Sequence, residues 1–193
     1  MSVLDRFLTL LLYLFGAILV ASVVHILSIL LMPQLAPRDS FSRLAPLGKP
    51  GQLALLPRPE PQRQITPFAD PAVAQGLCLF DLDKGPLSIR GNIEAGGLVT
   101  LSFRTRSGRI FYAMTDRATQ HGVVDIRVVT ADQRETLEGE EEEQEPRQEL
   151  RLVSPEKIGF VLISAFVPFP SAWAESEAQI NSITCSLEPI AEE

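Results

Sequence analysis

The hydrophobic positions of the chain fall into one long N-terminal run followed by a series of short segments. Residues 7–32 contain no Asp, Glu, Lys or Arg. As a helix rising about 1.5 Å per residue, this run would be about 39 Å long. A bilayer hydrocarbon core is about 30 Å thick. The pattern therefore predicts a transmembrane anchor over residues 1–33.

A cleavable signal peptide and a buried core helix are the alternatives for this run. A signal peptide has an apolar region of about 7–15 residues that ends at small residues. Here the run continues for ten residues beyond the best small pair, Ala21-Ser22. A core helix would be shorter and would carry a polar stripe. We expect an uncleaved anchor, in which His25 is a candidate contact within the membrane because ionisable side chains are rare there.

Nine prolines follow between Pro33 and Pro71. Proline lacks a backbone donor and fixes φ, so the pattern predicts an extended tether over residues 34–66. The apolar residues 53–56 within it are a candidate edge strand. Asp70-Pro71 then has the form of a helix start, which predicts one short turn ending at Gly76.

Beyond residue 67 the apolar segments are short and partly alternate with polar residues, which is typical of strands. In the strand predicted over residues 122–130, Asp125 and Arg127 are expected on the solvent face. The segment 158–167 is the most apolar and is expected to be a central strand. The other predicted strands cover residues 77–82, 87–90, 98–105, 110–114 and 150–153.

A C-terminal helix is predicted from a cap at Ser171 to about Thr184. Trp173, Ile180, Ile183 and Leu187 would form its buried stripe. The predicted fold class is α+β. One transmembrane helix precedes a small, mostly antiparallel sheet domain of six or seven strands over residues 67–193, with a C-terminal helix.

The formal net charge of −7 is concentrated in residues 138–149, which hold seven acids and one Arg. This segment predicts a solvated loop, with a Ca²⁺ site or a site for a basic partner as alternatives. The rest of the chain is close to neutral, which excludes the basic face that a nucleic-acid-binding domain needs.

Cys78 and Cys185 are the two cysteines. An even number in a domain outside the cytosol predicts a disulfide bond; two buried free thiols are the alternative. Counted by the positive-inside rule, Arg38, Arg43 and Lys49 after the run favour a cytoplasmic domain. The short N-terminal tail and the cysteines favour the opposite. We expect a cytoplasmic N-terminus and a domain on the other side of the membrane.

A cysteine before a short F-D-L-x-x-G-P strand is combined with a C-terminal helix that ends in cysteine, at Cys78, Phe80-Asp81-Leu82, Gly85-Pro86 and Cys185. With residues 25–44, 67–91, 107–119 and 163–185, these positions resemble the family called domain of unknown function 1254, in its short, membrane-anchored form. The resemblance implies an alphaproteobacterial envelope protein with an anchor and an external, periplasmic domain, and it implies no reaction. The chain departs from the family at Arg104-Thr105, where members tend to have an aromatic-acidic pair, and at Leu79, where a basic residue is common.

Few residues carry candidate chemistry. Ser154 and Lys157 fit the letters S-x-x-K, but the partner motifs of penicillin-recognising enzymes do not follow. Asp81 and Asp83 are a weak candidate cation site, better explained as a strand end that enters a turn. The sequence predicts no metal site and no cofactor. The candidate partner or ligand contacts are Asp81, Arg104, Tyr112, His121 and Phe169.

These features together predict a non-enzymatic, single-pass protein of the bacterial inner membrane whose periplasmic domain binds another envelope protein. An envelope hydrolase or a small-ligand-binding domain is the alternative. A third hypothesis is a subunit of a membrane complex held through the helix and His25.

Overall fold

The computed structural model describes residues 3–35, 39–60, 69–93, 98–119, 122–141 and 149–188. The chain forms two compact units, Met1–Pro37 and Arg38–Glu193. The first unit contains the helix α1, Val3–Leu35. Its segment Leu4–Met32 is long and apolar enough to cross a membrane. His25 lies within this segment, and the helix continues two residues past Pro33.

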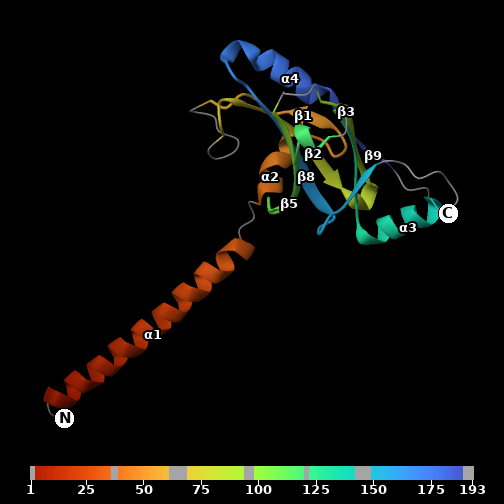
Figure 1. Cartoon of the computed structure of the whole chain (residues 1–193). Coiled ribbons are helices and arrows are strands. Elements are labelled where there is room, and N and C mark those ends of the chain that lie inside the picture. Colours follow the sequence, from red (N-terminus) through yellow and green to blue (C-terminus); the bar gives the residue numbers. More distant parts are fainter. Residues whose placement is uncertain are drawn as a thin grey trace. The chain divides into compact units, whose positions relative to one another are not determined.

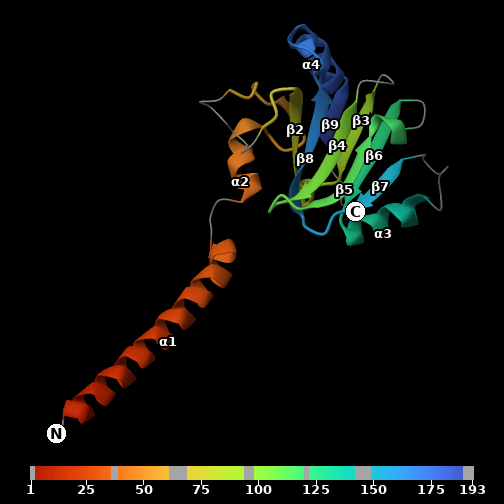
Figure 2. The same ribbon diagram turned by 60° about the vertical axis from the view of Figure 1, so that its left-hand side comes forward.

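The second unit is built on two sheets whose strands run across the domain in Figures 1 and 2. The five-stranded sheet has the order β1-β2-β8-β4-β5, and the four-stranded sheet has the order β7-β6-β3-β9. All pairings are antiparallel except β6 with β7. The strands are β1 Leu53–Leu55, β2 Val73–Asp81, β3 Leu87–Asn92, β4 Val99–Thr105, β5 Ile110–Thr115, β6 Val123–Val129, β7 Leu150–Val153, β8 Ile158–Phe166 and β9 Ile183–Leu187.

The hydrophobic core lies between the two sheets and follows the alternation of each strand. In β4, Leu101 and Phe103 point inward and are fully buried, whereas Arg104 is on the other face and partly exposed. Ile126 of β6 and Ile163 of β8 belong to the same buried cluster. The predicted α+β class is therefore confirmed, as is the central position of the most apolar strand, β8.

The segment before β2 packs on the outer face of the five-stranded sheet. It contains the helix α2, Ser40–Leu44, the 3-10 turn η1, Ala45–Leu47, and β1. Leu44 and Leu56 form a second buried cluster with Leu77, Leu79 and Phe160 of β2 and β8. The expected extended tether over residues 34–66 is therefore wrong for residues 39–60, because their leucines are spaced to cover the sheet. The expected edge strand within it is confirmed as β1.

The C-terminal helix is shorter than expected. After the 3-10 turn η4, Pro170–Ala172, the helix α4 covers Trp173–Asn181, and its N-cap is Ala172 rather than Ser171. Ile183 and Leu187, expected on the helix, lie on β9, which pairs with β3. The β-branched pair Ile183-Thr184 favours a strand, and the partner strand β3 provides its hydrogen bonds.

Two further expectations are corrected. Asp70 caps only a tight turn, in which its carboxylate accepts a hydrogen bond from the Ala72 N–H at 2.8 Å, and β2 begins at Val73. The helix α3, Ala131–Glu141, occupies the start of the acidic segment, which was expected to be a loop. It begins with a capping box, because the Gln133 N–H donates to the Thr130 hydroxyl and the Thr130 N–H donates to the Gln133 side chain.

The remaining short turns are η2, Leu82–Lys84, and η3, Asp116–Ala118. η2 ends β2, and η3 follows the edge strand β5. In Figure 2, α4 lies at one end of the sheets and α3 lies beside β7.

Candidate binding cleft at one edge of the sandwich

One edge of the sandwich is closed. There β1 ends the five-stranded sheet and β9 ends the four-stranded sheet. The predicted disulfide bond is confirmed: Cys78 of β2 is bonded to Cys185 of β9. Gly51, at φ +73°, lies so close to β9 that a Cβ there would be 3.0 Å from the Leu187 backbone nitrogen. Covalent and backbone contacts thus hold this edge shut.

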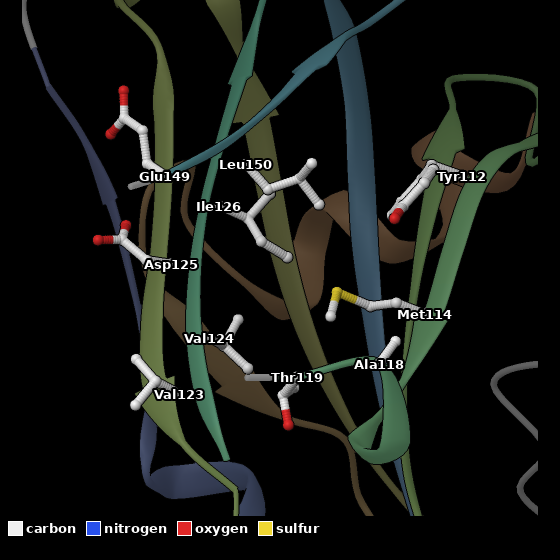
Figure 3. A pocket seen from close by; sticks show the side chains of 10 residues that line it. All are labelled: Tyr112, Met114, Ala118, Thr119, Val123, Val124, Asp125, Ile126, Glu149 and Leu150. Carbon is white, nitrogen blue, oxygen red and sulfur yellow. The ribbon is translucent and has the colours of Figure 1, made fainter. Parts of the chain in front are cut away.

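The opposite edge is open. Here β5 ends the five-stranded sheet and β7 ends the four-stranded sheet, and a cleft of about 830 Å³ lies between them. Tyr112 and Met114 of β5 line one wall (Figure 3), and Ala118 and Thr119 continue that wall beyond the strand. The other wall comes from β6 and β7.

The cleft has an apolar floor. Met114, Val124 and Ile126 are buried at its base. Leu150 lies at its rim and is 41% exposed. The exposed Val123 side chain points away from the cleft, on the same side of β6 as Asp125 (Figure 3).

The carboxylates at the cleft do not face into it. In Figure 3, the side chains of Asp125 and Glu149 point away from the space that Val124, Ile126 and Leu150 enclose. On the cleft side, the described lining offers the hydroxyls of Tyr112 and Thr119, and the Thr119 hydroxyl already donates to the Asp116 carbonyl. The lining therefore combines apolar side chains with accessible polar atoms.

Charges are paired on the outer face of the four-stranded sheet, behind the cleft. Arg127, expected in solvent, is buried, and its guanidinium lies 2.8 Å from a Glu188 carboxylate oxygen and 3.4 Å from a Glu149 oxygen. The contact with Glu149 is an ion pair without an aligned hydrogen bond. Arg151 donates to Glu149 at 2.9 Å, and Arg90 donates to Asp125 at 3.2 Å. Asp125, Glu149 and Glu188 each have an arginine partner on this face of the sheet. Unpaired charges there would be unfavourable.

β5 and β7 are edge strands of their sheets. Within the described ranges, no strand pairs with the outer side of β5 or of β7. An edge strand presents a row of free N–H and C=O groups. The cleft is thus flanked by two rows of backbone donors and acceptors.

The sequence-predicted contacts are not brought together at one site. Tyr112 lines the cleft, and its ring packs 5.9 Å from that of Phe103. Phe169 is exposed just before η4. His121 lies outside the described residues. Asp81 ends β2, accepts a hydrogen bond from the Asp83 N–H and forms an ion pair with Lys84, which confirms the strand-end interpretation.

Arg104 lies on the outer face of β4, away from the cleft. Its Nε donates to the Ser102 hydroxyl at 3.2 Å. Partial burial lowers the pKa of its guanidinium, which nevertheless remains charged at neutral pH because an arginine pKa is so high.

Ser154 and Lys157 do not form a catalytic pair. The buried Ser154 hydroxyl donates to the Glu156 carbonyl at 2.6 Å. The Lys157 amine bonds to Asp83 at 2.7 Å, and this hydrogen bond and the Asp83 charge raise the pKa of the lysine. A protonated lysine cannot act as a base. In the described part of the chain, no group of three or more His, Cys, Asp or Glu residues could hold a metal ion.

Most residues that line the cleft were not predicted as site residues. Leu150 has the pattern of an ordinary strand residue, and its exposure follows from the position of β7 at the edge of its sheet. One signal was available: Leu150 and Leu152 alternate with Glu149, Arg151 and Val153, which indicates a strand with one apolar face. Nothing local could show that the strand lies at an edge.

Comparison with known proteins shows the fold alone. No family model matches the chain, and no curated protein matches it. The resemblance to domain of unknown function 1254 therefore stays a prediction. The chain is similar in structure to the VPA0106 protein from Vibrio parahaemolyticus, with a TM-score of 0.53 and 7% identity, over 79% of this chain and 36% of that one. An uncharacterized protein from Burkholderia cenocepacia aligns with a TM-score of 0.45 and 10% identity, over 80% of this chain and 44% of its own.

Proposed function

We propose that this protein is a single-pass protein of the bacterial inner membrane whose folded domain binds an extended, apolar segment of another envelope protein in the cleft between β5 and β7. The N-terminus lies in the cytoplasm and the domain lies in the periplasm. The bound segment adds its backbone to an edge strand and places alternate side chains in the cleft.

The membrane assignment is supported by α1 and by the disulfide bond. The segment Leu4–Met32 exceeds the length needed to cross a hydrocarbon core. The bond between Cys78 and Cys185 fits an oxidising compartment such as the periplasm. A reporter enzyme fused to the C-terminus, active only on the periplasmic side, tests the orientation. Activity of a cytoplasmic reporter at the same position would reverse the assignment.

The open edge is the observation that carries the proposed binding. An extended peptide is the ligand that can use free N–H and C=O groups and apolar pockets at the same time, as in strand addition to other sheets. The cleft combines the edges of β5 and β7 with the apolar side chains Met114, Ile126 and Leu150.

Binding of a segment fits the lining better than catalysis or recognition of a polar metabolite. Sites for small polar ligands hold several polar groups that converge on one point. Here the Asp125 and Glu149 side chains point away from the cleft, and Ser154 and Lys157 are committed to other partners.

The matched pair Leu150→Glu and Val153→Glu tests the proposal. Both residues lie on β7 and have similar exposed fractions, 41% and 40%, but Leu150 lines the cleft and Val153 does not. In gently solubilised membranes, native and Val153→Glu chains are expected to migrate as a complex larger than the single chain. Leu150→Glu is expected to migrate alone.

Two outcomes would contradict this assignment. A native chain that migrates alone in several mild detergents has no stable partner. A complex that survives Leu150→Glu forms through another surface.

A further inference from the structure

The turn between β4 and β5 is fixed to the first helix of the folded domain. The Phe41 N–H donates to the Arg106 carbonyl at 3.1 Å, and the Ser40 hydroxyl donates to the Ser107 carbonyl at 3.1 Å. The Arg106 guanidinium forms an ion pair with Asp39, the N-cap of α2. Gly108, at φ +92°, leaves room for Ser40, because a Cβ at Gly108 would lie 2.5 Å from the Ser40 oxygen. The turn and α2 therefore form one surface.

This surface is basic in a chain whose net charge is negative. Arg43 of α2 and Arg109 of the turn are exposed, and no ion pair joins either to an acid of the described chain. Arg104 has a hydroxyl partner, Ser102, rather than an acid.

Two acids lie at this surface. Asp39 pairs with Arg106, whereas Glu156 accepts a hydrogen bond from the neutral Arg106 N–H at 3.0 Å and keeps its charge. The four arginines Arg43, Arg104, Arg106 and Arg109 outnumber these two acids, so the surface has a net positive charge.

An apolar side chain stands among these cations. Ile110 opens β5, pairs in register with Arg104 and is 50% exposed. The sequence Arg109-Ile110 thus places a charged head beside an apolar group at the same point of the surface. Such a combination matches the boundary between headgroups and acyl chains.

The surface follows α1 closely in the sequence. Asp39, the N-cap of α2, lies four positions after Leu35, the last residue of α1. This step rests on the proposed membrane-spanning role of α1.

We propose that the surface formed by Arg43, Arg104, Arg109 and Ile110 docks on the headgroups of anionic phospholipids. The arginines pair with lipid phosphates, and Ile110 enters the boundary region. Docking fixes the domain against the bilayer through a second contact besides the anchor. The cleft between β5 and β7 is a different surface, so lipid docking and partner binding are separable.

Single-tryptophan variants of the full-length chain in vesicles test the proposal. The chain has one tryptophan, Trp173, which Trp173→Phe removes. In that background, Ile110→Trp reports on the proposed surface, and Val153→Trp reports on an outer-face position of similar exposure. Quenching by brominated acyl chains measures how closely each indole approaches the lipid.

We expect strong quenching of Trp at position 110 in vesicles of phosphatidylcholine with a third phosphatidylglycerol. We expect much weaker quenching in phosphatidylcholine alone, and little at position 153 in either. Salt near 1 M, where the Debye length is about 3 Å, should remove the difference between vesicles. Each of Arg43→Gln and Arg109→Gln should lower the ratio of docked to free domain by about fivefold, the usual effect of one basic residue at an anionic surface.

Arg117→Gln is the matched charge control, because Arg117 is exposed on η3 at the other end of β5. It should leave quenching unchanged. Equal quenching in both kinds of vesicle, or an equal effect of Arg117→Gln, would overturn the proposal.

Hydrogen exchange of the unmodified chain provides a second measurement that needs no tryptophan replacement. Amides of residues 105–110 should exchange more slowly in anionic than in neutral vesicles. Neither assay contains the protein partner. A negative result here would overturn lipid docking but not partner binding, and a negative result in the Leu150→Glu test would overturn partner binding but not lipid docking.

Discussion

The two edges of the sandwich are built from the same kinds of strand and differ in how they are finished. At the closed edge, the disulfide bond links β2 to β9, and the backbone around Gly51 packs on Leu187. At the open edge, β5 and β7 leave a cleft whose rim exposes Leu150. Burying this apolar side chain would be favourable, so a sandwich selected for stability alone would close here too. The difference fits the proposal that the closed edge serves stability and the open edge serves binding.

The charged face behind the sheet connects the two edges. Arg127 of β6 pairs with Glu188, which follows β9, and with Glu149, which precedes β7. These ion pairs tie the segment before β7 to β6, and they tie β6 to the segment after β9. They therefore help to hold β7 in the sheet, although it lies at the open edge.

Loss of the disulfide bond should have the largest effect on stability. The cysteines are separated by 107 residues, and closing a loop of about 100 residues stabilises by up to about 4.7 kcal/mol in the chain-entropy model. Cys78→Ala with Cys185→Ala should lower the free energy of unfolding by about 4 kcal/mol. Urea unfolding in detergent, followed by Trp173 fluorescence, measures it. Reduction of the native chain should give a similar loss, and a loss below about 1 kcal/mol would show that other contacts hold the closed edge.

Arg127→Met should have the next largest effect, a loss of about 3 kcal/mol, because it leaves the buried Glu149 carboxylate with one cation fewer. Glu149→Gln in the same chain should recover part of that loss, since it removes the uncompensated charge. A double-mutant cycle by urea unfolding measures the coupling. Strictly additive effects would mean that the pair does not link β6 to β7.

Gly51→Ala should lower the free energy of unfolding by about 1–2 kcal/mol, because an L residue is strained at φ +73° and its Cβ meets β9. The control is Gly139→Ala in α3, where a Cβ meets nothing within 4 Å. This change should stabilise by up to about 1 kcal/mol through helix propensity. Equal effects of the two changes would argue against tight packing at the closed edge.

Acid should loosen the contact that holds the start of β5. Partial burial raises the pKa of Asp39, but hydrogen bonds from Ser42 and the Arg106 side chain outweigh it and hold the pKa below its ordinary value. A lowered folded-state pKa contributes stability above the unfolded value, about 3.9, and this stability is lost as the pH falls through the folded pKa. Below about pH 4, the protection of the amides of residues 105–110, measured against their intrinsic exchange rates at the same pH, should therefore fall in the native chain and not in Asp39→Asn. An unchanged pH profile in Asp39→Asn would exclude this carboxyl as the cause.

Leu150→Glu should have the smallest effect on stability, within about 0.5 kcal/mol, because the side chain is already exposed at the mouth of the cleft. Urea unfolding beside Val153→Glu is the measurement. A much larger loss for Leu150→Glu would show that Leu150 belongs to the core rather than to a binding surface.

Local sequence patterns predicted the strands well, because the alternation of apolar and polar residues along a strand reflects which of its faces is buried. They predicted the disulfide bond from the number of cysteines and the inferred compartment. They missed α3, although Thr130 and Gln133 have the spacing of a capping box, because the acidic run following them suggested a loop. They placed Arg127 in solvent because its partners lie 22 and 61 residues away. The cleft itself depends on strand order, which no local pattern contains, so only Tyr112 among the predicted contacts lies in it.

Photo-crosslinking in living cells tests the open edge most directly. A photoreactive residue at Tyr112, which points into the cleft, is compared with one at Thr184, an exposed position on the closed-edge strand β9. We predict that position 112 gives a discrete adduct with a second protein, abolished by Leu150→Glu, and that position 184 gives none. Adducts of equal yield at both positions, or adducts at position 184 alone, would contradict the account.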